Sequence, residues 1–368
     1  MIVRPLTEYC TLNMGQSPDS KTYNTQGKGL PFYQGNADFG ETHPITHVWC
    51  SAPVKVAEDG DILISVRAPI GAMNMAVERC CIGRGLAALT PIRNKCSKQF
   101  LYYALQSKVD SLIAQGTGST FKAISKKVLE ATCIPAYSTI EQEQIAETIG
   151  HVDNTIAARR KQLALLDQLV KSRFIELFGE PLSNQKGWQT MSIVEAAPIK
   201  SQRSNLADEV WLLNLDAVEA QTGTVLFKHR VQSGEINAST VYFTAESVLF
   251  SKLRPYLNKV VMPDEDGVAT SEMIPMCPLA DRLNRAYLCY WLRSDAFVRH
   301  ISEKVAGAKM PRVSMDYFRS LAIEMPPLEL QEQFAAFVEQ TDKSKLAVQK
   351  GLQELEILKK SLMQQYFG

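Results

Sequence analysis

The chain has 368 residues, of which 45% are hydrophobic and 21% are charged. This length allows two domains of ordinary size with connecting structure, and this composition excludes a disordered chain. The formal net charge is only +1, whereas nucleic-acid-binding domains are usually basic. A protein of that class with this charge would have to cluster its cations or rely on those of a partner.

The sequence carries no sign of a membrane span, a secretory leader or a metal site. No run of about 18 apolar residues occurs, and the start MIVRPLTEYC lacks the apolar core of a signal peptide. The eight cysteines are scattered without a CxxC pair, which favours neither a zinc site nor a disulfide framework. We therefore expect a reduced, cytoplasmic protein that binds no metal.

Residues 1–136 predict a globular domain of the α+β class. Short apolar runs bounded by Gly, Asp and Pro read DGDILISV at 59–66 and GLAALTP at 85–91, and a helical stretch follows at 98–115. This domain carries four more basic than acidic residues. Its local charge is therefore more favourable to an anionic partner than the charge of the whole chain.

A long helix is predicted within residues 137–180, after the boundary that Pro135 marks. Glu141 and Glu143 fall in its first turn, where acidic side chains interact favourably with the helix dipole. Apolar residues then recur at alternating spacings of three and four over about five heptads. These residues are Ile145, Ile149, Val152, Ile156, Leu163, Leu166, Val170 and Leu177.

Residues 181–326 predict a second α+β domain, and residues 327–368 a second long helix. The domain contains a β-type segment at 240–251 and a helical stretch at 285–302, and its acidic and basic residues are equal in number. The stripe of the second helix is formed by Phe334, Val338, Thr341, Lys345, Val348, Leu352, Leu355, Lys359, Leu362 and Tyr366.

The two halves are predicted to be copies of one unit. Residues of about 100–179 match those of about 287–368 at an offset close to 189, with Gln-Glu-Gln and a final Phe-Gly in both. Weaker matches extend upstream, where Ser65 and Arg67 resemble Ser251 and Arg254. The fixed order of these matches favours a duplication over two unrelated helices that share a tripeptide.

Neither long helix could bury its apolar stripe alone, and we infer that the two pair with each other. A pseudo-twofold relation between the copies makes the pairing antiparallel, and about 38 residues would extend about 57 Å and hold the domains apart. Arg159, Arg173, Lys345 and Lys359 interrupt the stripe. We interpret them as solvated edges from which long side chains reach water, with a dedicated polar contact as the alternative.

Motifs for catalysis are missing from the sequence. It contains no GxxxxGK[ST], no HExxH and no Asn-Pro-Pro-aromatic tetrapeptide, and no pair of nucleophile and base stands out. The acidic run 263–266 lacks the following acid-x-Lys of a metal-dependent nuclease and is interpreted as an exposed turn. We therefore expect no catalytic residues in this chain.

Polar and cationic residues gather in loops of both domains. Lys, Arg, hydroxyls and backbone N–H groups bind phosphates, whereas Arg, Asn, Gln and Lys can read base edges. The DNA-binding candidates of the first domain are Gln16, Ser17, Gln34, Asn36, Ser65, Arg67, Thr117, Ser119, Thr120 and Lys122. Those of the second are Lys252, Arg254, Asn258, Lys309 and Arg312. A surface ion pair is the alternative for each arginine.

The repeated Gln-Glu-Gln stands at the start of each long helix. Two roles are open for it, namely hydrogen bonding at the helix start or contact with a partner protein. The candidate partner-binding residues are Gln142, Glu143, Gln144, Gln331, Glu332 and Gln333.

These segments together resemble the specificity subunits of type I restriction–modification systems. The run LYYALQS…GTGSTFKAISKKVLE…IP…EQEQIAETI is similar to the pattern of that family, as are GDILISVRAPIG, GRGLAALTP and VLFSKLRPYLNKV. The second glycine loop departs from the family pattern, because it reads GAKMPRVS in place of GSTFKAIS-like sequence. The resemblance extends over essentially the whole chain.

The resemblance implies two target-recognition domains, 1–136 and 181–326, related by a pseudo-twofold and separated by an antiparallel coiled coil of the helices in 137–180 and 327–368. Each domain would read one half of a split DNA sequence, so the spacing of the halves would follow the helix length. It further implies two DNA methyltransferase subunits, which flip and modify adenine with S-adenosylmethionine, and motor-nuclease subunits that use ATP and Mg²⁺.

Two other classes of function are compatible with parts of this pattern. A fused restriction–modification enzyme would act alone, but the motifs for it are missing. A stand-alone DNA-binding protein or a protein-docking adaptor would need no restriction partner. Salt-dependent binding to random duplex DNA distinguishes these two, because only the DNA-binding protein would show it.

Overall fold

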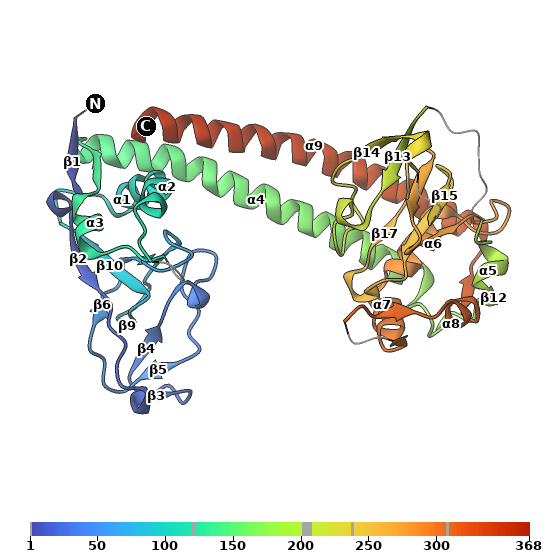
Figure 1. Cartoon of the computed structure of the whole chain (residues 1–368), viewed down its shortest axis with the longest axis horizontal. Coiled ribbons are helices and arrows are strands. Elements are labelled where there is room, and N and C mark those ends of the chain that lie inside the picture. Colours follow the sequence, from blue (N-terminus) through green and yellow to red (C-terminus); the bar gives the residue numbers. More distant parts are fainter. Residues whose placement is uncertain (1, 119–121, 201–207, 237–238, 307–308) are drawn as a thin grey trace. The chain divides into compact units, whose positions relative to one another are not determined.

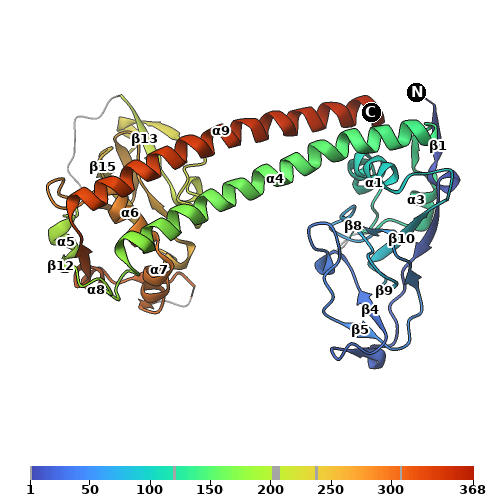
Figure 2. The ribbon, with the colours of Figure 1, turned by 180° about the vertical axis from the view of Figure 1, so that it is seen from behind.

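The computed structural model describes residues 2–118, 122–200, 208–236, 239–306 and 309–368. Within the chain, unit 1 is formed by Met1–Arg159 with Gly351–Gly368, and unit 2 by Arg160–Lys350. Helices α4 (Thr139–Phe178) and α9 (Leu328–Phe367) are each divided between the two units, so that one part of each helix belongs to unit 1 and the other part to unit 2 (Figures 1 and 2). Both lie within the ranges predicted for the long helices.

Unit 1 combines three antiparallel or mixed sheets with three short helices. The sheets have the strand orders β2-β10-β7-β8, β3-β5-β4-β9-β6 and β1-β11. Their strands are β1 Val3–Pro5, β2 Cys10–Met14, β3 Tyr23–Asn24, β4 Leu30–Tyr33, β5 Trp49–Cys50, β6 Val56–Ala57, β7 Ile62–Ser65, β8 Met73–Met75, β9 Cys80–Ile82, β10 Leu86–Pro91 and β11 Cys133–Pro135. The helices are α1 Lys98–Ser107, α2 Val109–Ala114 and α3 Lys126–Ala131.

Unit 2 has the same kinds of element in a related order. Its sheets run β14-β13-β18-β15, β17-β16-β19, β12-β22 and β20-β21. The strands are β12 Gln189–Ser192, β13 Glu209–Leu213, β14 His229–Gln232, β15 Thr240–Phe243, β16 Val248–Ser251, β17 Val260–Val261, β18 Gly267–Thr270, β19 Met273–Met276, β20 Val305–Ala306, β21 Arg312–Val313 and β22 Ala322–Met325. The helices are α5 Ile193–Ala196, α6 Arg285–Arg293, α7 Asp295–Ser302 and α8 Met315–Arg319.

The α+β prediction is confirmed in both units. The structure differs from the prediction in that some segments predicted as one helix or one strand are divided into two. Each predicted helical stretch is divided, into α1 and α2 in unit 1 and into α6 and α7 in unit 2. Ser294 ends α6 and caps α7, because its hydroxyl accepts a hydrogen bond from the Phe297 N–H. The segment predicted at 240–251 is likewise two strands, β15 and β16, and not one.

Aromatic side chains join the long helices to the core of each unit. In unit 1 the rings of Phe367 and Phe100 lie 5.4 Å apart, and both side chains are buried. In unit 2 the rings of Phe174 and Phe334 meet edge to face at 5.3 Å, and Tyr287 stacks on Phe174 at 5.5 Å. Aromatic burial of this kind contributes more than the same area of aliphatic contact.

The two long helices run antiparallel, because the start of one belongs with the end of the other in each unit. The N-terminal part of α4 and the C-terminal end of α9 share the core of unit 1. The C-terminal part of α4 and the N-terminal part of α9 share the core of unit 2. All residues predicted for the two apolar stripes are buried or half-buried, so the heptad pattern identified the packed faces.

The lysines on the stripe are not solvated edges. Lys359 in unit 1 is only 24% exposed and pairs with Asp153 at 2.7 Å. Lys345 in unit 2 is 17% exposed and pairs with Asp167 at 2.7 Å and with Asp342 at 3.2 Å. The interpretation as solvated edges was therefore wrong for these two lysines. Each is a polar contact to the other helix, which fixes the pairing of the helices in the way a buried polar residue fixes a coiled coil.

The first glutamine of each Gln-Glu-Gln forms hydrogen bonds that join a long helix to the start of a short helix, α1 in unit 1 and α6 in unit 2. In unit 1 the Gln142 amide accepts a hydrogen bond from Ser97 N–H at 2.9 Å and donates to the carbonyls of Lys95 and Tyr137. Ser97 is the N-cap residue of α1. Gln142 has no exposed surface, so three buried backbone groups depend on one side chain.

Gln331 repeats this arrangement in unit 2. Its amide accepts from Asn284 N–H at 2.8 Å and donates to the carbonyls of Arg282 and Pro326. Asn284 is the N-cap of α6, and Gln331 is fully buried. Of the two roles left open for the tripeptide, helix-start hydrogen bonding is the one these two side chains perform. The expectation of a partner contact is corrected for Gln142 and Gln331, which offer a partner no surface.

Replacing Gln142 with leucine is expected to lower the free energy of unfolding by about 1–3 kcal/mol. The physical reason is that the substitution leaves a buried N–H and two carbonyls without partners. Denaturant unfolding of the full chain, followed by circular dichroism, measures the change. Gln144→Leu is the matched control, since Gln144 is exposed and should change stability by no more than about 0.5 kcal/mol. Equal effects of the two substitutions would contradict the role given to Gln142.

Candidate nucleic-acid interface

The turn Gly83–Gly85, which joins β9 to β10, is the meeting point of the loops predicted for unit 1. Its backbone is fixed from two sides. Gly83 N–H donates to the Tyr33 carbonyl at 2.8 Å, and Gly85 N–H donates to the Gln34 carbonyl at 3.2 Å. Gly15, at the end of β2, donates to the Leu86 carbonyl at 2.9 Å. The segments 15–17 and 33–36 therefore lie against the same turn.

Glycine is required where these backbones meet. A Cβ atom on Gly85 would overlap the carbonyl oxygen of Gln34, and one on Gly15 would overlap the carbonyl oxygen of Gly83. Both obstacles are backbone atoms, which cannot rotate away as a flexible side chain could. The glycines thus bring three loops closer together than any other residue would allow.

The same turn also holds the loop that follows β7. Val66 N–H donates to the Gly85 carbonyl at 2.9 Å, and the Val66 carbonyl accepts from Ile124 N–H at 2.9 Å. Ala68 N–H donates to the Lys122 carbonyl at 3.1 Å. The segments 15–17, 33–36 and 65–69, together with 116–118 and 122–124 of a fourth loop, are therefore joined around one turn, and we call the combined exposed face of these described residues the unit 1 surface.

Most candidates from the first domain lie on the unit 1 surface. The side chains of Gln16, Ser17, Gln34, Arg67, Thr117 and Lys122 are exposed and that of Asn36 is half-buried. Ser119 and Thr120 fall outside the described residues. Ser65 is a correction, because it is 1% exposed and its hydroxyl donates to the Arg67 carbonyl at 2.8 Å. It shapes the turn before Arg67 and has no free surface for DNA.

Sequence reasoning missed Arg84, the central residue of the turn. Its side chain is exposed, whereas Gly83 and Gly85 on either side are buried. Its N–H donates to the Ser17 hydroxyl at 3.4 Å. An arginine between two glycines at a strand end was the available signal, but only the folded backbone shows that the candidate loops surround it.

In unit 1, Val66 is hydrogen-bonded through its N–H to Gly85 and through its carbonyl to Ile124, and we call these backbone hydrogen bonds the backbone frame. Unit 2 repeats this frame. Lys252 N–H donates to the Glu272 carbonyl at 3.0 Å, and the Lys252 carbonyl accepts from Val313 N–H at 3.0 Å. Arg254 N–H donates to the Pro311 carbonyl at 2.8 Å. The buried Ser251 hydroxyl donates to the Leu253 carbonyl at 3.0 Å, as Ser65 does to Arg67.

This frame corrects the alignment of the two loops by one residue. The hydrogen bond from Arg254 to Pro311 corresponds to that from Ala68 to Lys122, and the isolated bridge of Leu253 with Arg312 corresponds to that of Arg67 with Ala123. Arg67 therefore matches Leu253, and Arg254 is displaced by one position along the chain. Arg254 adopts φ 49° and ψ 61°, a left-handed conformation uncommon outside glycine.

The candidates of the second domain differ in how available they are. Arg254 and Lys309 are exposed and Lys252 is half-buried. Arg312 is exposed but makes a bidentate ion pair with Glu272, at 2.8 Å in its closest contact, and this hydrogen bonding raises the pKa of Arg312. Asn258 is a correction, since it is 2% exposed and donates to the Arg293 carbonyl at 3.0 Å.

The acidic run 263–266 takes part in an ion-pair network with β14. Lys228 Nζ lies 2.7 Å from Asp264 and 2.9 Å from Glu265, and Arg230 lies 2.7 Å from Glu265. Hydrogen bonding to Lys228 is the main cause that lowers the pKa of both carboxyl groups. These two cations are engaged within unit 2, so they are poor candidates for phosphate contacts.

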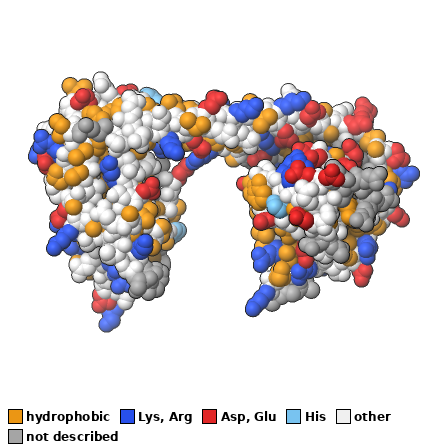
Figure 3. Space-filling model, turned by 45° about the horizontal axis from the view of Figure 1, so that its top comes forward, with side chains coloured by type: hydrophobic (Ala, Val, Ile, Leu, Met, Phe, Trp, Pro, Cys, Tyr) orange, Lys and Arg blue, Asp and Glu red, His pale blue; other side chains and the backbone are white. Residues whose placement is uncertain are grey.

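Basic and acidic side chains are interspersed over the surface of each unit on the face that Figure 3 shows. This distribution agrees with the near-neutral charge of the chain. On this face, the cations are therefore dispersed and form no continuous basic patch.

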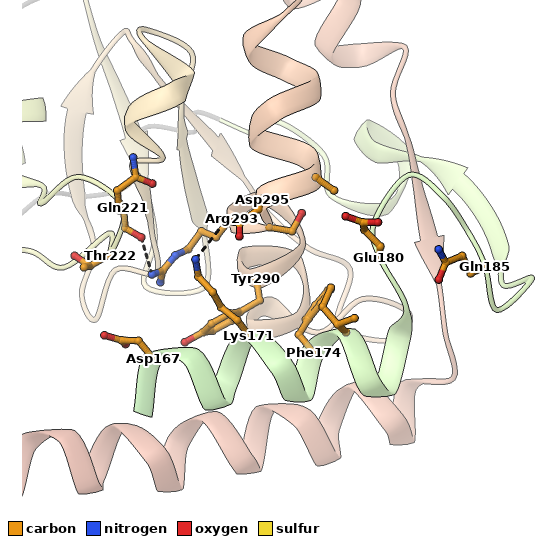
Figure 4. A pocket seen from close by; sticks show the side chains of 13 residues that line it. Asp167, Lys171, Phe174, Glu180, Gln185, Gln221, Thr222, Tyr290, Arg293 and Asp295 are labelled. Atoms are coloured by element: carbon orange, nitrogen blue, oxygen red, sulfur yellow. Dashed lines mark hydrogen bonds and ion pairs between the residues drawn. The ribbon is translucent and has the colours of Figure 1, made fainter. Parts of the chain in front are cut away.

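A pocket of about 520 Å³ opens in unit 2 between α4 and the junction of α6 with α7. Phe174 and Tyr290 supply its apolar wall, and the two cations in its lining are engaged, since Lys171 pairs with Asp295 at 3.2 Å and Arg293 donates to the Gln221 carbonyl at 3.3 Å (Figure 4). Its lining offers no activated nucleophile and base. None of the predicted DNA-binding residues lines it.

The described residues hold neither a candidate metal site nor a candidate membrane span. They contain no group of three His, Cys, Asp or Glu side chains that could hold a metal ion. None of the described helices is long and apolar enough to cross a membrane.

Gly85→Ala is expected to lower the free energy of unfolding by about 1–3 kcal/mol, because the added methyl group forces the turn away from Gln34. Denaturant unfolding of the full chain measures the effect. Gly35→Ala is the matched control, since nothing lies within 4 Å of a Cβ at Gly35. If both substitutions left stability unchanged, the close approach at Gly85 would not constrain the loops.

Comparisons with known proteins agree with this architecture. At 41% identity over 164 residues, the chain is similar to the MjaX specificity subunit of a type I restriction enzyme from Methanocaldococcus jannaschii, a match that takes in 45% of this chain and 39% of that relative. It is 22% identical to the MjaIX specificity subunit of the same organism, over 95% of this chain and 88% of the relative.

A solved structure has the same fold over the whole chain. It is the S subunit of a type I restriction–modification system from M. genitalium, with a TM-score of 0.63 and 16% identity, covering 100% of this chain and 96% of the other. The family described as type I restriction modification DNA specificity domain matches residues 1–168 and again residues 185–357. The protein therefore belongs to the type I restriction–modification DNA specificity family and carries two copies of its domain.

Proposed function

We propose that this chain is the DNA-recognition subunit of a type I restriction–modification complex, with each unit reading one half of a split DNA sequence. One observation carries the proposal, namely that the same backbone frame occurs twice with different side chains. The frame that joins Val66, Gly85 and Ile124 recurs at Lys252, Glu272 and Val313. Two similar frames with different exposed residues suit two short and different half-sites.

The exposed residues on these frames have the chemistry that DNA recognition needs. Arg67 and Lys122 in unit 1 and Arg254 and Lys309 in unit 2 are exposed cations. They form no ion pair with any residue the structure describes. Amide and hydroxyl side chains accompany them on the unit 1 surface. Cations of this kind bind phosphates, whereas arginine and the amides can also form paired hydrogen bonds to base edges.

Partner subunits are proposed to bind the long helices. Large aliphatic side chains remain exposed on both, although heptad packing buries the opposite face. In unit 2 these are Leu165, Leu169, Ile175 and Leu346, and in unit 1 they are Ile140, Ile357 and Leu358. Exposed apolar residues along a helix suit packing against helices of another protein. The exposed Glu143, Gln144, Glu332 and Gln333 remain available for such a contact.

The chemistry is proposed to lie with those partners. Two methyltransferase subunits would flip and modify target adenines using S-adenosylmethionine, and motor-nuclease subunits would use ATP and Mg²⁺. In this arrangement the present chain supplies sequence recognition and assembly, and binds no cofactor itself. A protein-docking adaptor without DNA is the alternative, and it would use the helices but leave the loop cations without a role.

Mapping modified adenines in cellular DNA tests the function. A bipartite methylated sequence should appear only when this chain is produced with its methyltransferase. Arg67→Ala should relax one half of that sequence and Arg254→Ala the other, each by about 1–3 kcal/mol at a base the side chain contacts. Arg4→Ala and Arg319→Ala are matched controls, because both arginines pair with nearby acids outside the candidate loops.

Two results would speak against this function, and a third would change the role given to an arginine. No methylated sequence that depends on the chain would exclude a specificity role altogether. Relaxation of the same half by both variants would exclude one half-site per unit. A uniform loss of affinity on random duplex DNA, with a smaller salt dependence, would assign the arginine concerned to phosphate and not to a base.

Leu169→Glu is expected to weaken association with the methyltransferase by about tenfold or more, since it places a charge where an aliphatic side chain would be buried. Sedimentation or light scattering of the mixed proteins measures the association. Gln168→Glu adds the same charge at the neighbouring exposed position and should leave association within about twofold. Equal behaviour of the two variants would place the partner elsewhere.

A further inference from the structure

Among the described residues, the Arg84 guanidinium has no ion-pair or hydrogen-bond partner, and it stands on the turn that the loops of the unit 1 surface contact. Its neighbours in sequence, Gly83 and Gly85, are buried, and the side chain itself is exposed. Of the cations on the unit 1 surface, Arg67 and Lys122 come from the loops at its edge, whereas Arg84 comes from the turn that joins all four loops.

The backbone that carries Arg84 is held in place before any ligand arrives. Hydrogen bonds from Gly83 to Tyr33 and from Gly85 to Gln34 fix the turn on one side, and that from Val66 to Gly85 fixes it on the other. The absence of a Cβ at Gly85 keeps these segments close. A side chain on a fixed backbone loses less conformational entropy on binding than one on a mobile loop.

The surroundings of Arg84 suit the edge of a base. The Ser17 hydroxyl accepts a hydrogen bond from the backbone N–H of Arg84. The exposed amide side chains of Gln16 and Gln34 belong to the two segments that contact the turn. An arginine guanidinium offers two parallel donors that match the O6 and N7 acceptors of guanine in the major groove. The amides of Gln16 and Gln34 have the donors and acceptors needed to read neighbouring bases.

Unit 2 has a different residue at the same place in its frame. Strand β18 pairs in parallel with β13 as β9 does with β4, and β19 pairs with β16 as β10 does with β7. The turn Thr270-Ser271-Glu272 therefore corresponds to Gly83-Arg84-Gly85, and the exposed Ser271 stands where Arg84 does. The backbone is repeated and the central side chain is not. This pattern is expected of a residue that sets the sequence read and not of one that maintains the fold.

We propose that Arg84 is a specificity-determining residue of unit 1 and that it reads a guanine in the half-site of that unit. The proposal rests on the proposed function, since it needs a DNA-reading unit. It adds that the turn between the two strands, and not only the loops at its edge, selects the base. Unit 2 would select a different base at the equivalent step, because serine cannot form the paired contact of arginine.

The test selects duplexes from a pool with randomised positions, using the full chain in complex with its methyltransferase. Arg84→Ala should lose about 5- to 150-fold of its preference at one base pair of one half-site. The other half-site should be unchanged. Arg84→Lys should not restore the preference, because lysine lacks the two parallel donors. Arg79→Ala is the matched control, since Arg79 is exposed in the same unit and pairs with Glu58.

Thermal melting checks that Arg84→Ala folds, and its melting temperature should match that of the wild-type chain because the side chain is exposed. Unchanged selection by the folded variant overturns the proposal. A uniform loss over all sequences that lysine restores also overturns it, because it indicates a phosphate contact. If the wild-type complex selects no sequence at all, the proposed function itself fails, and this outcome is distinguishable from failure at Arg84 alone.

Discussion

A buried glutamine amide at the start of each long helix joins that helix to the rest of its own unit. Gln142 and Gln331 each bind three backbone groups, one of them the N–H of the N-cap residue of a short helix, α1 or α6. Within a unit, the amide therefore joins the long helix to that short helix and to the carbonyl of Tyr137 or Pro326, which lies shortly before the long helix. Because these groups are buried, any displacement would leave them unsatisfied. Most of the loops that carry the candidate DNA-binding residues follow strands of the sheets in the same unit.

The sequence was sufficient for features that follow from local periodicity. The stripe from Ile145 to Leu177 predicted the packed face of α4, since helical spacing alone decides which residues share a face. It failed for Lys345 and Lys359, because their acidic partners lie on the other helix, and heptad spacing does not show which residues stand opposite each other. A lysine in the stripe looks the same whether it reaches water or an aspartate. Only the register of the two helices distinguishes these cases.

The candidate site shows the same division between local and tertiary information. Residue type found the exposed Arg67 and Lys122, but it also selected Ser65 and Asn258, whose polar groups serve buried turns. A side chain that can bind DNA can equally bind backbone, and sequence gives no measure of burial. Arg84 was missed for the opposite reason. Arg84 stands on a turn contacted by loops that are distant in the chain, and these loops meet only in the fold.

The duplicated frame separates what must be constant from what can vary. Its hydrogen bonds run between backbone groups, so they place almost no demand on the side chains at Arg84 or Ser271. Exchange of an exposed residue at this turn therefore costs little stability, whereas exchange of a glycine that allows close backbone approach costs much more. A scaffold of this kind can acquire a new recognition sequence without refolding. Under the proposed function, the same physical division would let two units with a common backbone read different half-sites.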